Sequence, residues 1–530
     1  MTAHTPSTLG TPSTGLDWVH QLDRHAFMKP DELALRYKGV DTTWGQLSER
    51  SRRLASALTA FGVSRGDRVI IMVTNRPEFA EALLAINTLG AVAVPINFRL
   101  VAREVQFLAE NSGARAVVVE QPLAALIAEV RAKSESPLAA IVVGDEPSQA
   151  GPDAVGYEDT ISGHEPSDAD GPQSESELAM IMYTSGTTGL PKGSMLTYQN
   201  MVAQTLTMAL IGDEMLEEDI KLITPPLFHI AGVGNLLPSI ITGSRSVIMP
   251  TGMFNAADLL DVLEQEKITS VFLVPTQWQA VCAHPGIAER DLRLTTIAWG
   301  ASPATPAILR AMAETFPDAK NICSFGQTEM SPVTTLLPGR DAVRKLGSVG
   351  KPVPLVAMRI VDPAMNDVAP GEVGEIVYRG PGTMIGYWNN EQATADAFSG
   401  GWFHSGDLVR QDEEGFIYVV DRVKDMIISG GENIYSSEVE NAIADHPKVY
   451  EVAVVGVPHE KWVETPVAFV VPKDENDPPT PAEIIEFCVE RIASYKKPSV
   501  VHVIGELPRN ASGKVLKAPL RDQAKQPAEA

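Results

Sequence analysis

A segment rich in hydroxyl groups and glycines, closed by a single lysine, is the part of this sequence best suited to hold phosphate. It runs Tyr183-Thr-Ser-Gly-Thr-Thr-Gly-Leu-Pro-Lys-Gly193, directly after a strand-like apolar run. Small residues let backbone N–H groups converge on phosphate oxygens, and hydroxyl and ammonium groups supply further donors. The Walker A spacing, with four residues between Gly and Gly-Lys-Ser/Thr, is not met, so the segment predicts a phosphate cradle of another kind. Its predicted contacts are Thr184, Ser185, Gly186, Thr187, Thr188, Gly189 and Lys192.

Two carboxylates and a second lysine stand in turn-like segments elsewhere in the chain. Glu329 ends Phe-Gly-Gln-Thr-Glu, and a carboxylate beside phosphates suits Mg²⁺, which takes hard oxygen ligands. Asp407 follows a glycine, where a carboxylate can accept hydrogen bonds from two neighbouring ribose hydroxyls. Lys514 ends Asn-Ala-Ser-Gly-Lys, and an ammonium on such a tip can approach a developing negative charge and then leave. Taken alone, Glu329 and Lys514 would be read as an ordinary solvated loop acid and an ordinary exposed lysine.

Together with the phosphate-loop segment, these motifs stand in the order found in one superfamily. The sequence resembles the adenylate-forming enzymes, which comprise acyl-CoA synthetases, nonribosomal-peptide adenylation domains and firefly-type luciferases, from about residue 33 to 517. In detail it is most similar to actinobacterial fatty-acid–CoA ligases. The matching segments are Pro226-Leu-Phe-His-Ile-Ala-Gly232, Trp299-Gly-Ala-Ser-Pro303, Phe325-Gly-Gln-Thr-Glu329, Gly401-Trp-Phe-His-Ser-Gly-Asp407, Asp421-Arg-Val-Lys-Asp425, Gly430-Gly-Glu432 and Pro508-Arg-Asn-Ala-Ser-Gly-Lys514.

The resemblance implies ATP, Mg²⁺ and CoA as cofactors and assigns roles to single residues. Lys514 corresponds to the adenylation lysine, Glu329 to the metal ligand and Asp407 to the ribose contact. Activating a carboxylate with ATP brings one anion onto another, so the site must neutralise charge, and a lysine and a metal ion are the natural means. Thr184 and His229 are also expected to be catalytic, and further nucleotide contacts are expected from Gly300, Ala301, Ser302, Ser324, Phe325, Gly326, Gln327, Thr328, Val419 and Arg422.

The resemblance also implies two reaction steps that use different orientations of a small C-terminal domain. Lys424 corresponds to the hinge, and Gly430 and Gly431 to backbone that lines the pantetheine tunnel. His229 corresponds to a residue that gates this tunnel by a change of rotamer. The family often carries Arg three residues beyond the adenylation lysine, where this chain has Lys517, so the role of Lys517 is left open.

The acid is predicted from the residues around His229. Amino-acid-activating relatives have an Asp here, which pairs with the substrate ammonium, so His argues against an amino acid. The expected wall of the acid site is apolar and contains Leu227, Ile230, Ala231, Val233, Gly234, Trp278, Trp299, Gly300, Gly326, Met330 and Val333. A hydrophobic carboxylate should bind there.

We therefore predict a fatty-acid–CoA ligase that forms an acyl-adenylate and pyrophosphate, and then acyl-CoA and AMP. The alternatives are an aryl or alicyclic acid–CoA ligase and a fatty-acyl-AMP ligase that loads a carrier protein. A luciferase-like oxidation and a catalytically idle binding protein are the remaining readings. Retention of Lys192, Glu329, Asp407 and Lys514 argues against the last.

These residues must be positioned by an α/β fold with mostly parallel sheets. Strand-like runs alternate with helix-like segments through the first 300 residues, as in the strand 294–299 followed by the helix 305–316. Residues 145–177 contain no Lys or Arg and many Gly, Pro and Ser, which favours an exposed connection. A β-rich subdomain is expected after 352. We predict an N-terminal domain, 1–423, that binds ATP and the acid, and a mobile C-terminal α+β domain, 424–530, with one helix opened by a capping box at Ser437-Glu-Val-Glu440 and a second opened by Thr480.

Composition limits the remaining possibilities. The 530 residues carry 43 Lys and Arg against 67 Asp and Glu, a net charge of −24 that argues against nucleic acid as a partner. Without an export signal or a long uninterrupted apolar run, we expect a cytoplasmic protein with no membrane span. The three cysteines, Cys282, Cys323 and Cys488, are expected to be reduced packing residues. A homodimer is left open.

Overall fold

The protein divides into two compact units of unequal size. A computed structural model describes residues 14–134, 137–184, 190–211, 219–302, 304–429, 432–489, 491–509 and 515–525. Unit 1 comprises Met1–Met358 and Tyr378–Phe403, and unit 2 comprises Arg359–Val377 and His404–Ala530. The predicted α/β class, with a large N-terminal part and a smaller C-terminal one, is confirmed. The predicted domain boundary after residue 423 and the hinge at Lys424 stay predictions.

One sheet of unit 1 positions the start of the phosphate-loop segment. Its order is β7-β6-β5-β3-β4-β8-β9, in which β9 runs antiparallel to β8 and the other pairs are parallel. Such strands, buried on both faces, read as continuous apolar runs, as in β3 and β5. The strands are β3 (Arg68–Met72), β4 (Val92–Pro95), β5 (Ala114–Glu120), β6 (Ala139–Val143), β7 (Val155–Gly156), β8 (Leu178–Thr184) and β9 (Lys192–Thr197).

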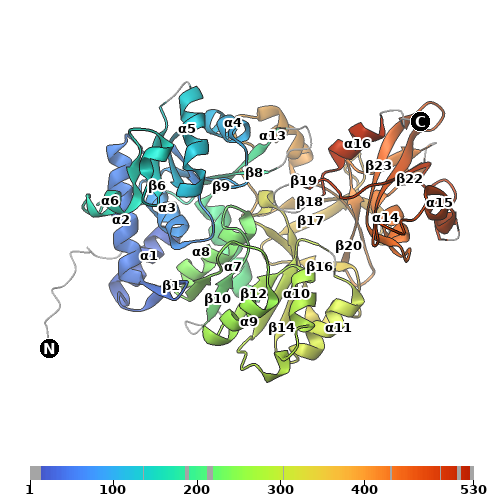
Figure 1. The fold of residues 1–530 in the computed structure, drawn as a ribbon, viewed down its shortest axis with the longest axis horizontal. Coiled ribbons are helices and arrows are strands. Elements are labelled where there is room, and N and C mark those ends of the chain that lie inside the picture. The colour runs from blue at the N-terminus through green and yellow to red at the C-terminus, as the bar shows by residue number, and fades with distance from the viewer. Residues whose placement is uncertain are drawn as a thin grey trace. The chain divides into compact units, whose positions relative to one another are not determined.

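Helices cover this sheet because alternate strand residues point to opposite faces. Ile70 and Met72 of β3 pack with Leu108 of α4 and Ile127 of α5. Helix α2 packs against α1, α3 and α6 (Figure 1). These helices are α1 (Trp18–Met28), α2 (Trp44–Ala60), α3 (Pro77–Thr88), α4 (Ala102–Ser112), α5 (Ala124–Lys133) and α6 (Tyr157–Ser162).

A second sheet carries the other predicted nucleotide segments of unit 1. Its strands in this unit follow the order β16-β15-β14-β13-β12-β10-β11-β1-β2 and are parallel from β14 to β1. They are β1 (Leu33–Tyr37), β2 (Val40–Thr43), β10 (Ile220–Ile223), β11 (Arg245–Ile248), β12 (Ser270–Leu273), β13 (Thr296–Gly300), β14 (Lys320–Gly326), β15 (Val333–Pro338) and β16 (Ser348–Pro352). The remaining helices of unit 1 are α7 (Tyr198–Ile211), α8 (Ile230–Thr242), α9 (Ala256–Gln265), α10 (Pro275–Cys282), α11 (Pro306–Thr315), α12 (Gly339–Ala342) and α13 (Glu391–Ala397).

Unit 2 combines a β-rich part, which the sequence analysis assigns to the N-terminal domain, with a small α+β part. Strands β17 (Ala357–Val361), β18 (Val373–Arg379), β19 (Phe403–Gln411) and β20 (Ile417–Arg422) lie side by side in that order. A further sheet has the order β22-β21-β24-β23, with β25 paired to β24. Its strands are β21 (Ile427–Ser429), β22 (Glu432–Ile434), β23 (Val449–His459), β24 (Val463–Pro472) and β25 (Val500–Val503), with helices α14 (Ser436–Ala444), α15 (Pro481–Val489) and α16 (Lys517–Ala524).

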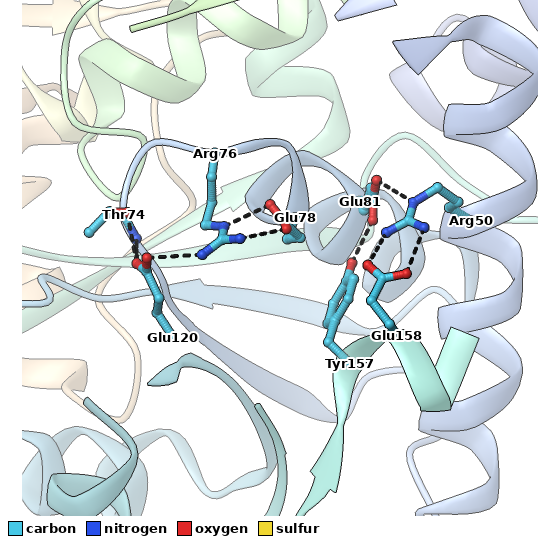
Figure 2. A network of polar contacts seen from close by, with 8 residues as sticks. All are labelled: Arg50, Thr74, Arg76, Glu78, Glu81, Glu120, Tyr157 and Glu158. Carbon is cyan, nitrogen blue, oxygen red and sulfur yellow. Dashed lines mark hydrogen bonds and ion pairs between the residues drawn. The ribbon is translucent and has the colours of Figure 1, made fainter. Parts of the chain in front are cut away.

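The segment 145–177 is not the plain solvated loop that its composition indicates. It contains β7 and α6, and Tyr157 of α6 is buried. The Tyr157 hydroxyl donates to Glu81 Oε2 at 2.8 Å, and Arg50 Nε lies 2.7 Å from Glu81 Oε1 (Figure 2). Arg50 also binds Glu158 of α6. A buried carboxylate is tolerated only when it is paired, so Glu81 ties α3 to both α2 and α6.

Both predicted helices of unit 2 are present, but one of their two predicted capping boxes is not. Thr480 and Glu483 form the expected reciprocal capping box at the start of α15. At α14, by contrast, Ser437 Oγ donates to the carbonyl of Val420, and Glu440 accepts from the backbone N–H of Val454. Tertiary partners therefore take the side chains that the local pattern assigns to a cap.

Candidate active site

The predicted metal ligand and the first residue of the phosphate-loop segment lie together in unit 1. Glu329 occupies a short turn, Thr328–Met330, between β14 and β15 and is only 8% exposed. Its Oε1 atom accepts a hydrogen bond from the Tyr387 hydroxyl at 3.1 Å and lies 3.4 Å from Thr184 Oγ1, which donates to it. Three segments far apart in the sequence thus orient one carboxylate.

Lys192 closes the base of the phosphate-loop segment. In the β8–β9 pair, Lys192 stands opposite Thr184, and its Nζ lies 5.2 Å from the centre of the Tyr387 ring. A cation over an aromatic face is attracted by the ring quadrupole. Tyr387 therefore contacts both the acidic and the basic residue of the site. The residues between them that were predicted to bind phosphate, Ser185, Gly186, Thr187, Thr188 and Gly189, lie outside the described residues.

Tyr387 was missed by the sequence analysis. The backbone around it is fixed from two sides, since Met195 N–H donates to the Gly386 carbonyl and Trp388 N–H donates to the Gly193 carbonyl. The N–H of Met384 donates to the Glu329 carbonyl at 2.8 Å. Only long-range pairing brings this segment to Glu329, so no local pattern could have identified it.

The glycines predicted to admit adenine or the acid are also required by the protein's own backbone. A Cβ atom on Gly300 would lie 2.3 Å from the Ser324 carbonyl oxygen, and one on Gly326 would lie 1.8 Å from the Pro332 carbonyl oxygen. Both distances are far below van der Waals contact, so neighbouring strands could not approach as they do. Ala301 adopts φ +65°, a conformation that costs free energy for a residue other than glycine. Ser302 beside it is exposed.

The other predicted nucleotide residues of unit 1 follow the course of β14. Ser324 and Phe325 are half-buried near its end, Gln327 caps the turn that carries Glu329, and Thr328 is buried within it. The stretch 324–329 therefore leads from the sheet directly to the carboxylate. Its contacts with a nucleotide remain predictions.

His229 is the N-cap of α8. Its Nδ1 atom accepts a hydrogen bond from the Ala231 N–H at 3.2 Å, which places the proton of the neutral ring on Nε2. The surroundings of the ring lower its pKa because they desolvate the charged form, although the side chain as a whole is exposed. A gating rotation of His229 would break the cap.

Most of the large apolar residues predicted to line the acid site are buried, whereas Ala231, Gly234 and Val333 are half-buried and Gly326 is exposed. Ile230, Val233 and Met330 have at most 2% exposure. Trp278 Nε1 donates to the Ala298 carbonyl and its ring packs edge-on to Phe316, while Trp299 Nε1 donates to Asn321. Both indole N–H groups already have acceptors within the protein. Contact with a substrate remains a prediction for all of them.

In unit 2, the predicted ribose carboxylate is paired with the predicted nucleotide arginine. Asp407 of β19 is 4% exposed, and its Oδ1 atom lies 2.8 Å from Arg422 Nε of β20. Val419, also on β20, is 38% exposed. Lys424 follows the strand, and partial burial lowers its pKa. Gly430, Gly431 and Lys514 lie outside the described residues.

The donor set at Glu329 fits Mg²⁺ bound together with phosphates. Within the ranges that the structure describes, no cluster of three Asp, Glu, His or Cys side chains could hold a metal alone. Mg²⁺ commonly takes one or two carboxylates, with substrate phosphates and water completing its shell. A single oriented carboxylate beside a phosphate loop meets that requirement.

None of the described helices is long and apolar enough to cross a bilayer.

Comparisons with known proteins agree with this geometry. The AMP-binding enzyme family matches residues 22–388, and the AMP-binding enzyme C-terminal domain matches residues 438–514. A feruloyl-CoA synthase from Amycolatopsis is 38% identical over 508 residues, which cover 94% of this chain and 97% of the relative. An indoleacetate–CoA ligase from Aromatoleum aromaticum is 38% identical over 95% of this chain and 97% of its own length. A long-chain-fatty-acid–CoA ligase from Mycobacterium tuberculosis is 36% identical over 91% and 93%.

A solved structure has the same fold over almost the whole chain. It is the o-succinylbenzoate CoA synthetase from Bacillus subtilis in complex with its acyl-adenylate intermediate, with a TM-score of 0.82 and 31% identity. The match covers 96% of this chain and 98% of that one. The same enzyme has been solved with ATP and a magnesium ion.

Proposed function

Because the chain belongs to the AMP-binding enzyme family, we propose that it is an AMP-forming CoA ligase that activates an aromatic carboxylic acid. ATP, Mg²⁺ and CoA are its cofactors. The observation that carries the proposal is the meeting of Glu329, Thr184 and Lys192 around Tyr387. Joining two anions requires positive charge, which Lys192 supplies directly and Glu329 would supply by holding Mg²⁺.

In the first half-reaction, a carboxylate oxygen of the acid attacks the α-phosphorus of ATP and the bond to pyrophosphate breaks. Mg²⁺, when bound, neutralises charge on the phosphate oxygens. Glu329 would hold it, and Thr184 and Tyr387 keep that carboxylate oriented. Lys192 contributes positive charge beside the phosphates, and Lys514 is proposed to bind the α-phosphate region during this step. Asp407 would accept hydrogen bonds from the ribose.

In the second half-reaction, the CoA sulfur attacks the acyl carbon of the adenylate. The bond between that carbon and the AMP oxygen breaks, and the thiol proton passes to the surrounding solvent or a nearby base. Gly430 and Gly431 are proposed to line the path of the thiol, with His229 at its end. Because His229 is neutral and carries its proton on Nε2, it can donate a hydrogen bond there without adding charge.

The aromatic acid class is proposed from the relatives and the apolar wall. The feruloyl-CoA synthase and the indoleacetate–CoA ligase are both more similar to this chain than the long-chain-fatty-acid–CoA ligase is. This order favours the aryl alternative of the sequence analysis over its main reading, a fatty acid. Trp278, Trp299 and Met330 of the predicted wall are apolar and buried, and an indole face is a good packing partner for an aromatic ring.

A fatty-acid–CoA ligase is the second candidate. The mycobacterial relative supports it, at 36% identity over most of both chains. The same apolar wall would accept an alkyl chain, so the residues alone do not separate the two classes.

The test is pyrophosphate release from ATP and Mg²⁺ with ferulate, indoleacetate, benzoate, octanoate and palmitate, with and without CoA. We expect release with an aromatic acid and the matching acyl-CoA, identified by mass, only when CoA is present. Preference for octanoate or palmitate would transfer the proposal to the second candidate. Release without any CoA product would indicate a carrier-protein acceptor, and no release with any acid would overturn the ligase assignment.

A further inference from the structure

Lys517 occupies a position at which its charge does not help the helix it begins. It is the first residue of α16, after the N-cap Leu516, and the first turn of that helix has no acidic residue. The helix dipole is positive at this end, so a cation there is repelled. A favourable contact elsewhere must therefore account for the placement of Lys517.

That contact is with α14. Lys517 Nζ donates to Ser436 Oγ at 2.7 Å and lies 2.7 Å from Glu440 Oε1. Ser436 and Glu440 are four residues apart, so one face of α14 presents a hydroxyl and a carboxylate to one ammonium group. Lys517 is largely buried, with 17% of its side chain exposed, which makes the pair less screened than a surface ion pair.

Both acceptors of Lys517 are held by further contacts. Ser436 is fully buried, and its Oγ atom donates in turn to Asp421 Oδ2 at 2.9 Å. Glu440 Oε1 accepts from Val454 N–H of β23 at 2.8 Å. Burial raises the pKa of Glu440, and the charge of Lys517 opposes that rise. Lys517 is thus attached to rigid elements of unit 2 and not to mobile side chains.

Lys517 also stands directly beside the base of the segment that carries Lys514. Arg509 and Val515 form an antiparallel bridge, and Leu516 N–H donates to the Pro508 carbonyl at 2.7 Å. The residues between 509 and 515 lie outside the described ranges. The two ends of this segment are joined at the bridge between Arg509 and Val515, two residues before Lys517.

We propose that Lys517 is a positioning residue for adenylation, which fixes the base of the Lys514 segment to α14. This inference rests on the proposed function, since it assigns Lys514 the adenylation step. Lys517 and Glu440 both follow Lys424, so a rotation about that predicted hinge leaves their contact intact. Lys517 itself touches neither ATP nor the acid in this role. Its loss acts by releasing the base of the segment that carries Lys514 from α14.

The test measures the two half-reactions separately in the full-length protein. Lys517→Met keeps the length and the apolar stem of the side chain but removes its charge. We expect acid-dependent ATP–pyrophosphate exchange to fall by about 10- to 100-fold, since a displacement of about 1 Å has effects of that size. Thioester formation from supplied acyl-adenylate and CoA should change less than about 2-fold. Lys517→Arg, which keeps the charge, should recover most of the exchange activity.

Lys525→Met is the matched control on the same helix. Lys525 is the exposed C-cap of α16, and its ammonium lies 3.2 Å from Asp522 of the same helix. We expect both half-reactions to be unchanged in this variant. Glu440→Gln tests the clamp from α14 without altering α16, and it serves in place of Lys517→Met should that variant not fold.

Hydrogen exchange gives a readout that does not depend on catalysis. The amide of Leu516 should exchange faster in Lys517→Met, while amides of β23 and β24 keep their protection. Equal loss in both half-reactions together with a lower melting temperature would overturn the proposal in favour of a merely structural role. Unchanged exchange activity would overturn it as well. If the wild type showed no ATP–pyrophosphate exchange with any of the acids, the proposed function would fail. The hydrogen-exchange result would still report on the contact between Lys517 and α14.

Discussion

Arg422 Nε lies 2.8 Å from Asp407 Oδ1, and the two residues face each other in register across β19 and β20. Asp407 is 4% exposed, whereas the Arg422 side chain is 37% exposed. Buried Asp407 therefore needs a partner for its charge, whereas water can solvate the guanidinium of Arg422. The ribose contact proposed for Asp407 would therefore add to a carboxylate that the arginine already holds in place.

Replacing Asp407 should weaken ATP binding more than it weakens the fold. Asp407→Asn keeps the shape but removes the charge, and hydrogen bonds to charged groups contribute about 1.5–3 kcal/mol. We expect the KM for ATP to rise by about 10- to 100-fold, which is that range converted to a ratio, with a smaller change in the KM for the acid. Steady-state pyrophosphate release at varied ATP measures this.

Asp367→Asn is the control for the loss of an ion pair in the same unit. Asp367 pairs with Arg359 Nε at 2.6 Å but is 67% exposed, so its replacement should change neither KM. A fall in melting temperature with an unchanged KM for ATP in Asp407→Asn would contradict the ribose role.

Glu329→Gln should separate metal binding from orientation. The amide can still accept from Thr184 and Tyr387, but it lacks the charge that favours Mg²⁺. We expect adenylation to slow by about 100-fold or more and the Mg²⁺ concentration for half-maximal rate to rise. Magnesium titrations of ATP–pyrophosphate exchange provide the measurement.

Tyr387→Phe tests the orientation alone. It removes one hydrogen bond to Glu329 and keeps the ring near Lys192, so a loss of about 3- to 10-fold is expected. An equal loss of adenylation rate in Glu329→Gln and Tyr387→Phe would mean that the charge of Glu329 does not contribute to adenylation beyond its orientation.

The sequence motifs predict those parts of the site whose residues are close together in the chain. The strand before the phosphate-loop segment and its closing lysine are such a case, because β8 and β9 form a hairpin and bring Thr184 opposite Lys192. The order of strands in two sheets cannot be read in this way. Tyr387 reaches Glu329 only because its segment pairs with β9, more than 190 residues earlier in the chain.

Misleading local patterns have the same physical origin. The capping box at Ser437 fails because Glu440 finds the Val454 amide and Lys517, partners that the helix pattern does not contain. The short helix α6 escapes prediction because its stability comes from burial of Tyr157 and its bond to Glu81, not from periodicity. Tertiary contacts override local preference in both places.

The three cysteines should resist alkylation in the folded protein. Burial raises the pKa of Cys323 to about 12 and also raises the pKa of Cys282 and Cys488, so little reactive thiolate is present at pH 8. We expect iodoacetamide to modify none of them in native protein and all three in urea, as read by intact mass. Modification of Cys323 in the native state at the rate of a free thiol would contradict its burial.

Desolvation of the charged ring should make His229 destabilising in acid. Its pKa lies below the ordinary value of 6.5, so below that pH the unfolded chain binds more protons than the native state does. Stability that His229 contributes at neutral pH is therefore lost as the pH falls from 7.5 to 5. His229→Asn preserves the cap, because Asn accepts the Ala231 N–H well, but does not titrate.

At pH 7.5 we expect the melting temperature of the wild type to equal or exceed that of His229→Asn. As the pH falls to 5, the melting temperature of the wild type should decrease relative to that of the variant. Scanning calorimetry across that range measures the difference. His459→Asn is the matched control, since His459 Nδ1 also accepts backbone N–H groups, from Lys461 and Trp462, in an exposed turn. A relative gain of the wild type in acid would mean that the native state favours the charged ring. His229 would then add a positive charge to the acid site, which the neutral ring proposed here does not.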